Sequence, residues 1–319
     1  MITILLAAYN GGKYLEAFLD SLKGQTVRDW QLIAFDDGST DNTQEIIRNF
    51  AFNNENKVYF KVNDPACGSA RDNFSMLIKE ARNKGADYCL FADQDDVWEP
   101  DKIETLMSAM EEAEKRYSDK IPVMVHSDLK VVDESLNTIA DSFFEYQQLD
   151  KKIGFCHLLI QNNVTGCASV INKTCLKAAA DTIGSPEVIM HDYWCALIAA
   201  TFGKLIFIDE PTVLYRQHGD NEVGAKNSRN LKYLKKRISD GAASYEEAMD
   251  RSYRQCRYFY ESFKDYDFRK TGRIEKKLEL IKEYSDLQNA GKLEKIAFYR
   301  RHGVWKKGAA RKAAQVLWS

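Results

Sequence analysis

Three carboxylates crowd into four consecutive positions, at Asp93, Asp95 and Asp96. They directly follow the apolar run 88–92, which has the composition of a buried strand. Like charges this close repel one another, so a bound cation is the natural compensation. Ligands that are all oxygen atoms favour a hard ion such as Mg2+ or Mn2+ over zinc, and such an ion commonly completes its shell with phosphate oxygens. The segment therefore predicts a divalent-metal site that handles a phosphorylated ligand.

Two earlier apolar runs also end in polar residues. The run 2–8 leads into Tyr9 and Asn10, and the run 31–35 leads into Asp36-Asp37-Gly38-Ser39. In open α/β sheets, ligands bind beyond the carboxyl ends of the strands, where such residues would gather. A turn followed by a helix cap explains the Asp36 segment equally well, because Asp and Gly are common turn residues.

Two later segments carry further candidate groups. Asp192 begins a helical pattern, where an acid in the first turn is favoured by the helix dipole even without a function. Arg216 and His218 follow a short apolar run near 212–216. A lone histidine is often a satisfied structural group, and we expect His126 and His157 to be of that kind.

The elements that would position these groups alternate between strands and helices. Apolar runs predict strands at 2–8, 31–35, 58–62 and 88–92, and helical spacing predicts helices at 14–22, 41–50, 72–83 and 100–117. Further strands are expected at 123–128, 166–171, 205–208 and 212–216, with a helix at 191–202. This order predicts an α/β fold, with right-handed crossovers and a Rossmann-like, mostly parallel sheet that has helices on both faces.

The chain changes character near residue 225. Beyond it, strand signals disappear, and Lys, Arg, Tyr and Glu recur at helical spacing. We therefore expect an α/β domain over 1–225 and a basic α-helical region over 226–319. The first part has 21 Lys and Arg against 35 Asp and Glu, net −14, and the second has 24 against 12, net +12, which sum to −2. The two parts are expected to face different partners.

The basic region interleaves its cations with bulky apolar residues. One basic cluster lies at 232–237, and the tail 298–318 mixes Arg and Lys with Tyr, Trp and Leu. This composition predicts helices at an anionic membrane surface. Packing on the acidic domain, or a homo-oligomer interface, is the alternative. Nucleic acid is not an expected partner, because the acidic domain would repel phosphates and no binding motif is present.

The overall composition excludes several classes of protein. The 319 residues are 45% hydrophobic and 29% charged, unlike collagen-like, disordered or coiled-coil chains. No apolar run approaches the ~18 residues of a membrane span, and the N-terminus lacks signal-peptide features. We therefore expect a cytoplasmic protein, peripheral at most on the inner face of the cell membrane. The seven cysteines form no CxxC pair, which argues against a disulfide framework and against zinc.

Three motifs, each at a strand end, together resemble the inverting family 2 glycosyltransferases of GT-A fold. They are Ala7-Ala8-Tyr9-Asn10, Phe35-Asp36-Asp37-Gly38-Ser39-Thr40-Asp41 and Asp93-Gln94-Asp95-Asp96, and the resemblance covers about 1–225. It implies that Asp36 binds the nucleotide base, that Asp93 lies against the ribose, and that Asp95 of this DXD motif holds the metal on the diphosphate. The backbone around Ala8 and Tyr9 would flank the base.

The resemblance also assigns the later groups. It implies that Asp192 is the catalytic base, which takes the proton of the acceptor hydroxyl as that oxygen attacks the anomeric carbon. The family often has a Glu-Asp pair there, and His191 replaces the Glu in this chain. His218 would be a metal ligand, and Arg216 would contact phosphate or acceptor.

Within the family, the later motifs look most like bacterial rhamnosyltransferases of cell-wall, capsule or O-antigen synthesis, which use dTDP-β-L-rhamnose. They are His191-Asp192-Tyr193-Trp194, Asp209-Glu210-Pro211 and the segment 215–224. We expect metal-dependent transfer of one sugar to a polysaccharide or polyprenyl-diphosphate-linked acceptor, because the Gln-x-x-Arg-Trp motif of processive members is absent.

Other functions compete with this one. A UDP-hexose-dependent enzyme of the same fold and a non-catalytic sugar-nucleotide-binding protein remain as alternatives. A nucleotidyltransferase would need a richer Gly and Arg loop than 10–13, and a dehydrogenase would need GxGxxG after the first strand.

Overall fold

The expected N-terminal strands form the parallel half of one sheet. The computed structural model describes residues 1–54, 57–151, 153–219, 241–266, 268 and 271–319. Strands β1 (Ile2–Ala8), β2 (Trp30–Asp36), β3 (Val58–Val62) and β4 (Tyr88–Asp93) lie in the order β3-β2-β1-β4, and all their pairings are parallel. Their carboxyl ends therefore meet at one edge, which gathers the polar residues that follow them.

The other half of the sheet mixes both directions. Strand β8 (Ser169–Asn172) pairs antiparallel with both β4 and β6 (Val123–Val132), and β6 then pairs parallel with β9 (Lys204–Arg216). Short strands β5 (Val97–Trp98) and β7 (Thr138–Ala140) add antiparallel pairs to β9 and β6. Because β8 is antiparallel to both β4 and β6, β6 runs in the same direction as β4.

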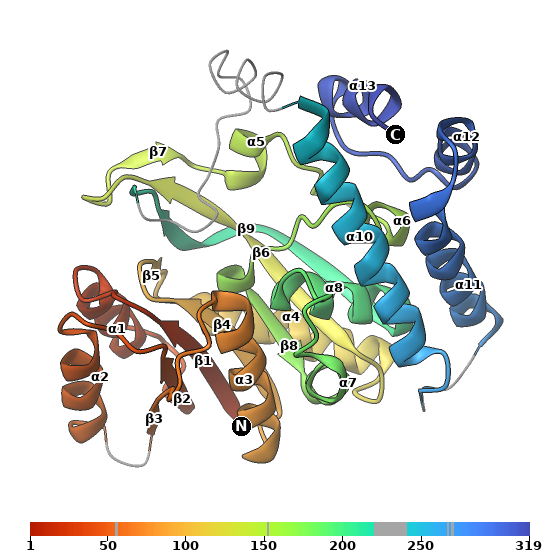
Figure 1. Cartoon of the computed structure of the whole chain (residues 1–319). Coiled ribbons are helices and arrows are strands. Elements are labelled where there is room, and N and C mark those ends of the chain that lie inside the picture. Colours follow the sequence, from red (N-terminus) through yellow and green to blue (C-terminus); the bar gives the residue numbers. More distant parts are fainter. Residues whose placement is uncertain (55–56, 152, 220–240, 267, 269–270) are drawn as a thin grey trace.

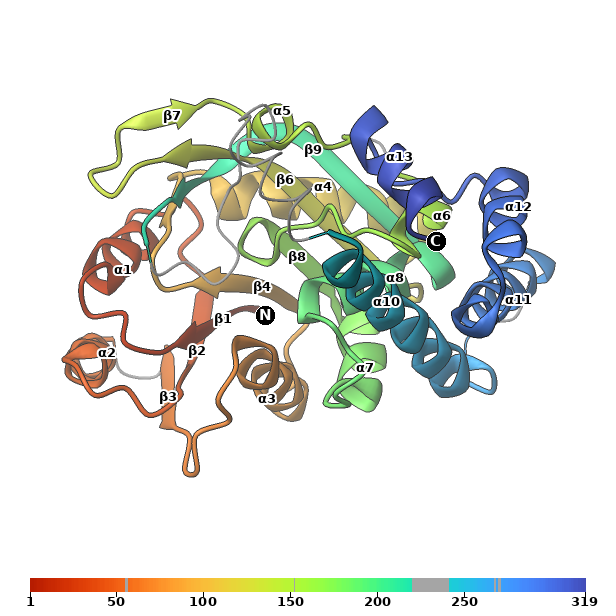
Figure 2. The ribbon, with the colours of Figure 1, turned by 45° about the horizontal axis from the view of Figure 1, so that its top comes forward.

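Helices cover both faces of the sheet, as expected from the alternating pattern (Figures 1 and 2). Helices α1 (Leu15–Lys23), α2 (Thr43–Phe52) and α4 (Lys102–Tyr117) pack on the face that receives Ile4 and Leu6. Helices α3 (Ala70–Asn83), α7 (Lys173–Thr182) and α8 (His191–Phe202) pack on the face that receives Leu5. Successive side chains of a strand point to opposite faces, so a strand buried on both sides reads as one apolar run.

The C-terminal helices share the second of these cores. They are α10 (Gly241–Phe263), α11 (Gly272–Asp286), α12 (Lys292–His302) and α13 (Ala309–Leu317), coloured teal to blue from the centre to the right of Figure 1. Phe259 of α10 is fully buried, with its ring centroid 5.2 Å from that of Trp194 and 6.0 Å from that of Phe202. Helix α8 is thereby enclosed, and every residue in it except Ala200 is buried.

Two expectations about local structure are wrong. Instead of two short strands, Lys204–Arg216 is one strand, β9, and its pairing with β6 shifts register where Pro211 stands opposite Asp128. Proline lacks an N–H, and the irregular register accommodates it within the strand. Residues Gly166–Ala168 form a 3-10 turn before β8 rather than its beginning, because the Gly166 N–H donates to Asp192.

Two further features bear on the expected domains. The expected boundary near 225 and the basic cluster at 232–237 lie outside the described residues. Short helices α5 (Phe143–Gln147) and α6 (Phe155–Leu158) lie in the chain between β7 and β8. Among the described helices, none combines the length and the hydrophobicity required to cross a membrane.

Candidate active site

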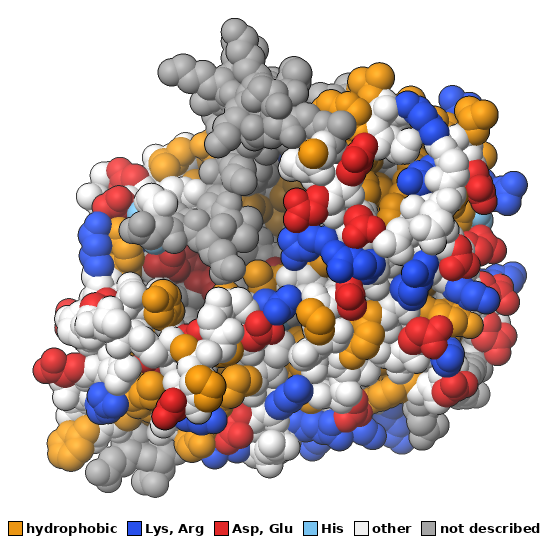
Figure 3. Space-filling view, in the orientation of Figure 1, with side chains coloured by type: hydrophobic (Ala, Val, Ile, Leu, Met, Phe, Trp, Pro, Cys, Tyr) orange, Lys and Arg blue, Asp and Glu red, His pale blue; other side chains and the backbone are white. Residues whose placement is uncertain are grey.

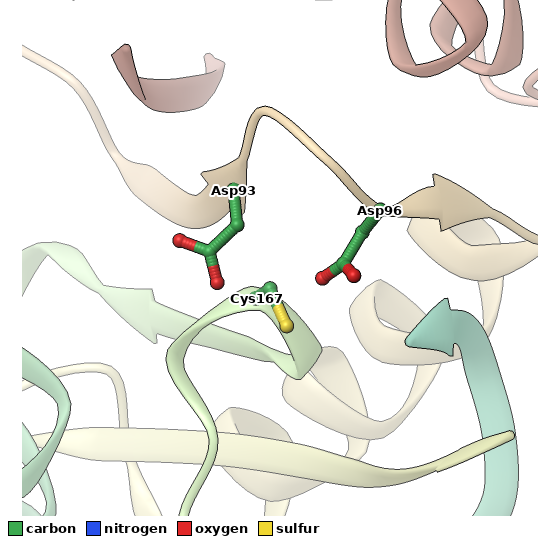
Figure 4. A group of neighbouring side chains, drawn as sticks. All are labelled: Asp93, Asp96 and Cys167. Carbon is green, nitrogen blue, oxygen red and sulfur yellow. The ribbon is translucent and has the colours of Figure 1, made fainter. Parts of the chain in front are cut away.

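The acidic segment lies where β4 ends and β5 begins, as three carboxylates around a tight connection. Ligating atoms of Asp93, Asp96 and Cys167 lie within 4.8 Å of one another, and Figure 4 shows the three side chains converging. Asp96 is fully buried; its Oδ1 accepts from the N–H of Arg216 at 3.1 Å, while its Oδ2 has no hydrogen-bond partner among the described residues. Desolvation, and then the neighbouring acids, raise the pKa of Asp93 and of Asp96. A bound cation would offset both the cost of desolvating these carboxylates and the repulsion between them.

A buried lysine lies beneath this cluster. Lys102, in the first turn of α4, is fully buried, donates to the carbonyl of Cys167, and places Nζ 3.4 Å from the Trp98 ring centroid. Desolvation lowers its pKa to about 7, although Asp96 and Asp93 oppose this shift. The same desolvation raises the pKa of the Cys167 thiol well above its usual value. That thiol therefore stays protonated at neutral pH and is a poor ligand for a hard cation.

Asp95 is held by residues from the far end of the chain. Its Oδ2 lies 2.8 Å from Nε2 of His218, and its carbonyl accepts from Nε of Arg216 at 2.7 Å. The Tyr14 ring lies against both partners, 4.8 Å from the Arg216 guanidinium and 4.7 Å from the His218 ring. Strand β9 therefore brings Arg216 and His218 to the DXD segment, about 120 positions away in sequence.

The ends of β1 and β2 are tied to the same edge. Tyr9 exchanges two hydrogen bonds with the Gln94 amide, at 2.9 and 2.8 Å, and its side chain is 58% exposed. The carbonyl of buried Ala8 accepts from the N–H of Asp37 at 2.8 Å. These bonds fix the first two polar strand ends beside the acidic segment.

Asp36 is buried in its own turn. Its Oδ1 accepts from the N–H of Ser39 at 2.9 Å and from the Gln44 amide at 2.9 Å, and the Ser39 hydroxyl donates to Oδ2. These hydrogen bonds are the ones expected of a turn followed by a helix cap. A carboxylate, however, can accept about four hydrogen bonds. Oδ2 keeps capacity for one more donor.

Asp192 begins α8 and is only 9% exposed. Its Oδ2 accepts from the N–H of Gly166 at 3.1 Å, and its Oδ1 accepts from the Asn162 amide at 3.2 Å and from the N–H of Tyr193. Desolvation raises its pKa to about 7, and the hydrogen bonds oppose that shift. The charge of Asp192 also contributes to the raised pKa of Asp93, so the two carboxylates lie close enough to repel each other.

His191 is an uncharged neighbour of Asp192. Its ring stacks on Phe74 at 3.8 Å and lies 4.6 Å from Phe91. Among the described residues neither ring nitrogen has a partner, and desolvation lowers its pKa to about 3. His191 therefore supports Asp192 by packing rather than by charge.

Several of these groups were not identified from the sequence. The side chains of Lys102, Asn162, Gln94 and Cys167 received no role there. Gln94 lies inside the DXD segment, so its position was a usable signal. Lys102 and Asn162 carry no local signal, because their partners are 65 and 30 residues away.

Comparisons with known proteins agree with this geometry. The sequence model described as "Glycosyl transferase family 2" matches residues 3–157. The chain is 31% identical to the dTDP-rhamnosyl transferase RfbG of Shigella flexneri over 237 residues, which cover 72% of this chain and 76% of that protein.

Solved structures show the same fold. S. aureus TarS in complex with UDP-GlcNAc has a TM-score of 0.56 at 12% identity, covering 99% of this chain and 89% of that one. Mannosyltransferase PcManGT from Pyrobaculum calidifontis, in complex with GDP-Man and Mn2+, has a TM-score of 0.53 at 14% identity, covering 97% and 76%. The architecture is accordingly the GT-A fold.

Proposed function

The chain belongs to glycosyl transferase family 2, and on that basis we propose that this glycosyltransferase moves a single L-rhamnose from dTDP-β-L-rhamnose to an acceptor. The acceptor is a glycan or a polyprenyl-diphosphate-linked sugar of bacterial cell-wall, capsule or O-antigen synthesis. The observation that carries the proposal is the turn Gly166–Ala168, which contacts Asp192 through the Gly166 N–H and lies beside Asp93 and Asp96 through Cys167, in a chain 31% identical to a dTDP-rhamnosyl transferase.

A divalent cation, Mg2+ or Mn2+, fits the residues at the DXD segment. Within the described part of the chain, Asp96 keeps a buried oxygen without a hydrogen-bond partner, and a cation would offset the repulsion between the carboxylates. Asp95 and His218 would hold the ion, with Asp93 directed to the ribose. When bound, the metal would neutralise charge on the departing diphosphate. Arg216 would add a guanidinium to the same phosphates, since its backbone and side chain are already anchored to Asp96 and Asp95.

Asp192 would act as the base. Three hydrogen bonds fix its carboxylate, and a pKa of about 7 matches the pH at which it must accept a proton. The acceptor oxygen forms a bond to the anomeric carbon while its proton passes to Asp192. The bond from that carbon to the diphosphate oxygen breaks on the opposite face, so the configuration inverts.

The nucleotide would lie along the ends of β1 and β2. The remaining acceptor position on Oδ2 of Asp36 suits an N–H of the base, and the backbone of Ala8 and Tyr9 would flank it. The exposed Tyr9 side chain offers a ring surface for a nucleotide base.

The test measures release of nucleoside diphosphate from dTDP-rhamnose, UDP-glucose and UDP-GlcNAc, with Mg2+, Mn2+ or EDTA. We expect metal-dependent release from dTDP-rhamnose. Asp95→Asn should lose the thermal shift given by donor plus metal. Asp192→Asn should keep that shift but turn over ~100-fold or more slowly, as expected of a lost base. Glu16→Gln, at an exposed position of α1, is the matched control and should behave as wild type.

The outcomes separate the alternatives. Release from a UDP-sugar and none from dTDP-rhamnose would establish a UDP-hexose enzyme of this family. Donor binding without turnover under any condition would indicate a sugar-nucleotide-binding protein. Near-normal turnover in Asp192→Asn would remove that residue from the chemistry.

A further inference from the structure

A shallow groove with an apolar floor and basic rim runs between α12 and α13. Its lining residues are Arg300, Trp305, Lys312, Ala313, Val316 and Leu317. Leu317 is 64% exposed and Val316 is 39% exposed. In Figure 3, hydrophobic and basic side chains mix over α12 and α13 at the upper right. A contiguous exposed apolar patch with a polar rim marks a surface that contacts a protein or a membrane.

The charge of this segment is strongly one-sided. Residues 292–319 contain eight Lys and Arg against one Glu. Arg300, Arg301 and Lys312 are exposed, and within the described part of the chain none of the three forms an ion pair. An anionic surface is therefore the complementary partner, and a second copy of the same face would be repelled.

The groove is a built surface rather than a loose tail. The Gln315 side chain is fully buried; its amide donates to the carbonyl of Val304 at 2.8 Å and accepts from the N–H of Lys306 at 2.9 Å. On the same side of α13, the Trp318 ring lies 5.8 Å from that of Tyr245 in α10. One side of α13 is thus fixed in the protein, which leaves Val316 and Leu317 directed outward.

The α12–α13 groove lies beside α5, which packs against β6. Strand β6 runs in the same direction as β4, and its Asp128 anchors the start of α5 by accepting from the N–H of Phe143 at 3.1 Å. Lys307 pairs with Asp150 at 2.7 Å, and Arg311 donates to the carbonyl of Gln147 at the end of α5. Figures 1 and 2 both show α13 beside α5.

We propose that the α12–α13 groove and its basic rim bind the surface of an anionic lipid bilayer. Leu317 and Val316 enter the headgroup level, and Arg300, Arg301 and Lys312 contact the anionic lipids. This surface is separate from the sugar-transfer site, so the proposal stands independently of the donor and of the metal.

The experiment is vesicle co-sedimentation of the full chain. Vesicles of phosphatidylcholine alone are compared with vesicles containing 40% phosphatidylglycerol, at low and high NaCl. Each basic residue near anionic lipid strengthens binding by about fivefold, so Arg300→Glu with Lys312→Glu should weaken binding by at least about 20-fold. Leu317→Ser should weaken it independently of salt. The matched control reverses Lys115 and Arg116, exposed on α4, and should bind like wild type.

Three results would overturn the proposal. They are wild-type protein that ignores anionic vesicles at low salt, groove variants that bind like wild type, and a control reversal that weakens binding equally. Light scattering gives a further check, because a wild-type dimer that Leu317→Ser converts to a monomer would make the groove an interface between copies. Far-UV circular dichroism and thermal unfolding, measured without vesicles, verify that each variant is folded.

Discussion

Replacing the proposed base should stabilise the protein above neutral pH. Burial raises the pKa of Asp192 from the usual 3.8 to about 7, so folding favours its protonated form. A carboxyl whose folded pKa is raised contributes most stability at acid pH, and that contribution is lost as pH rises from 3.8 through about 7. Asp192→Asn keeps the shape of the side chain and removes its charge, so the substitution should increase the free energy of unfolding mainly above neutral pH.

The magnitude follows from the shift itself. About three pKa units at 1.36 kcal/mol each give a penalty of about 4 kcal/mol at pH 8, and the same linkage leaves about 1.5 kcal/mol at pH 5. The asparagine amide cannot accept all three hydrogen bonds, and the unmatched donors cost about 1–3 kcal/mol. We therefore expect Asp192→Asn to gain about 1–3 kcal/mol at pH 8, and to lie between a gain of about 0.5 and a loss of about 1.5 kcal/mol at pH 5.

Urea unfolding in EDTA, at one-unit steps from pH 5 to pH 8, measures this difference. Asp133→Asn is the control of opposite sign. Hydrogen bonds from Asn137 lower the pKa of exposed Asp133, so its substitution should give no gain at pH 8. A pH-independent effect of Asp192→Asn, or a loss of stability at pH 8, would refute the assignment of a buried, desolvated carboxylate.

Three further substitutions follow from close packing. Gly203→Ala should cost at least about 2 kcal/mol in urea unfolding, because its Cβ would lie 1.8 Å from the carbonyl oxygen of Pro122. Gly166→Ala should slow turnover more than it lowers stability, because its Cβ would lie 2.6 Å from Nε2 of His191, beside the proposed base. Phe259→Ala should cost about 3–5 kcal/mol and leave one unfolding transition, because α10 and α8 share a core.

Each of these predictions has a control or a contrary result. Gly154→Ala serves both glycine variants, since its Cβ would meet nothing within 4 Å and its φ is −90°. Unchanged turnover in Gly166→Ala would show that the residues around Gly166 move to accommodate the added methyl group. Two separate unfolding transitions, with or without Phe259→Ala, would show that the C-terminal helices fold as an independent unit.

The strands and helices of the α/β part were predictable because their signals are local. The uninterrupted apolar run in β1 reflects burial on both faces, and the pattern predicted α8 at its observed bounds, His191–Phe202. The polar ends of β1, β2 and β4 meet as expected because parallel pairing places their carboxyl ends together. The strand at β9 was misjudged because Pro211 usually interrupts a strand, and here a register shift admits it.

The residues that surround the acidic side chains could not be predicted from local sequence patterns. Lys102 acts on Cys167, and Asn162 acts on Asp192, through contacts that depend on the assembled sheet. A lysine in the first turn of an amphipathic helix normally points to solvent, so nothing in its neighbours predicts full burial. Such groups become visible only when distant segments are placed side by side.

The enclosure of α8 also sets the order of events during synthesis. The ribosome releases the sheet and α8 before any of α10–α12, so the growing chain carries α8 with its outer face uncovered. Trp194, Phe202 and their neighbours remain uncovered until Phe259 and Phe263, about 60 residues later in the chain, have been synthesised. Asp192, the proposed base, stands in the first turn of that same helix, so we expect its surroundings to be completed only after α10 has been synthesised.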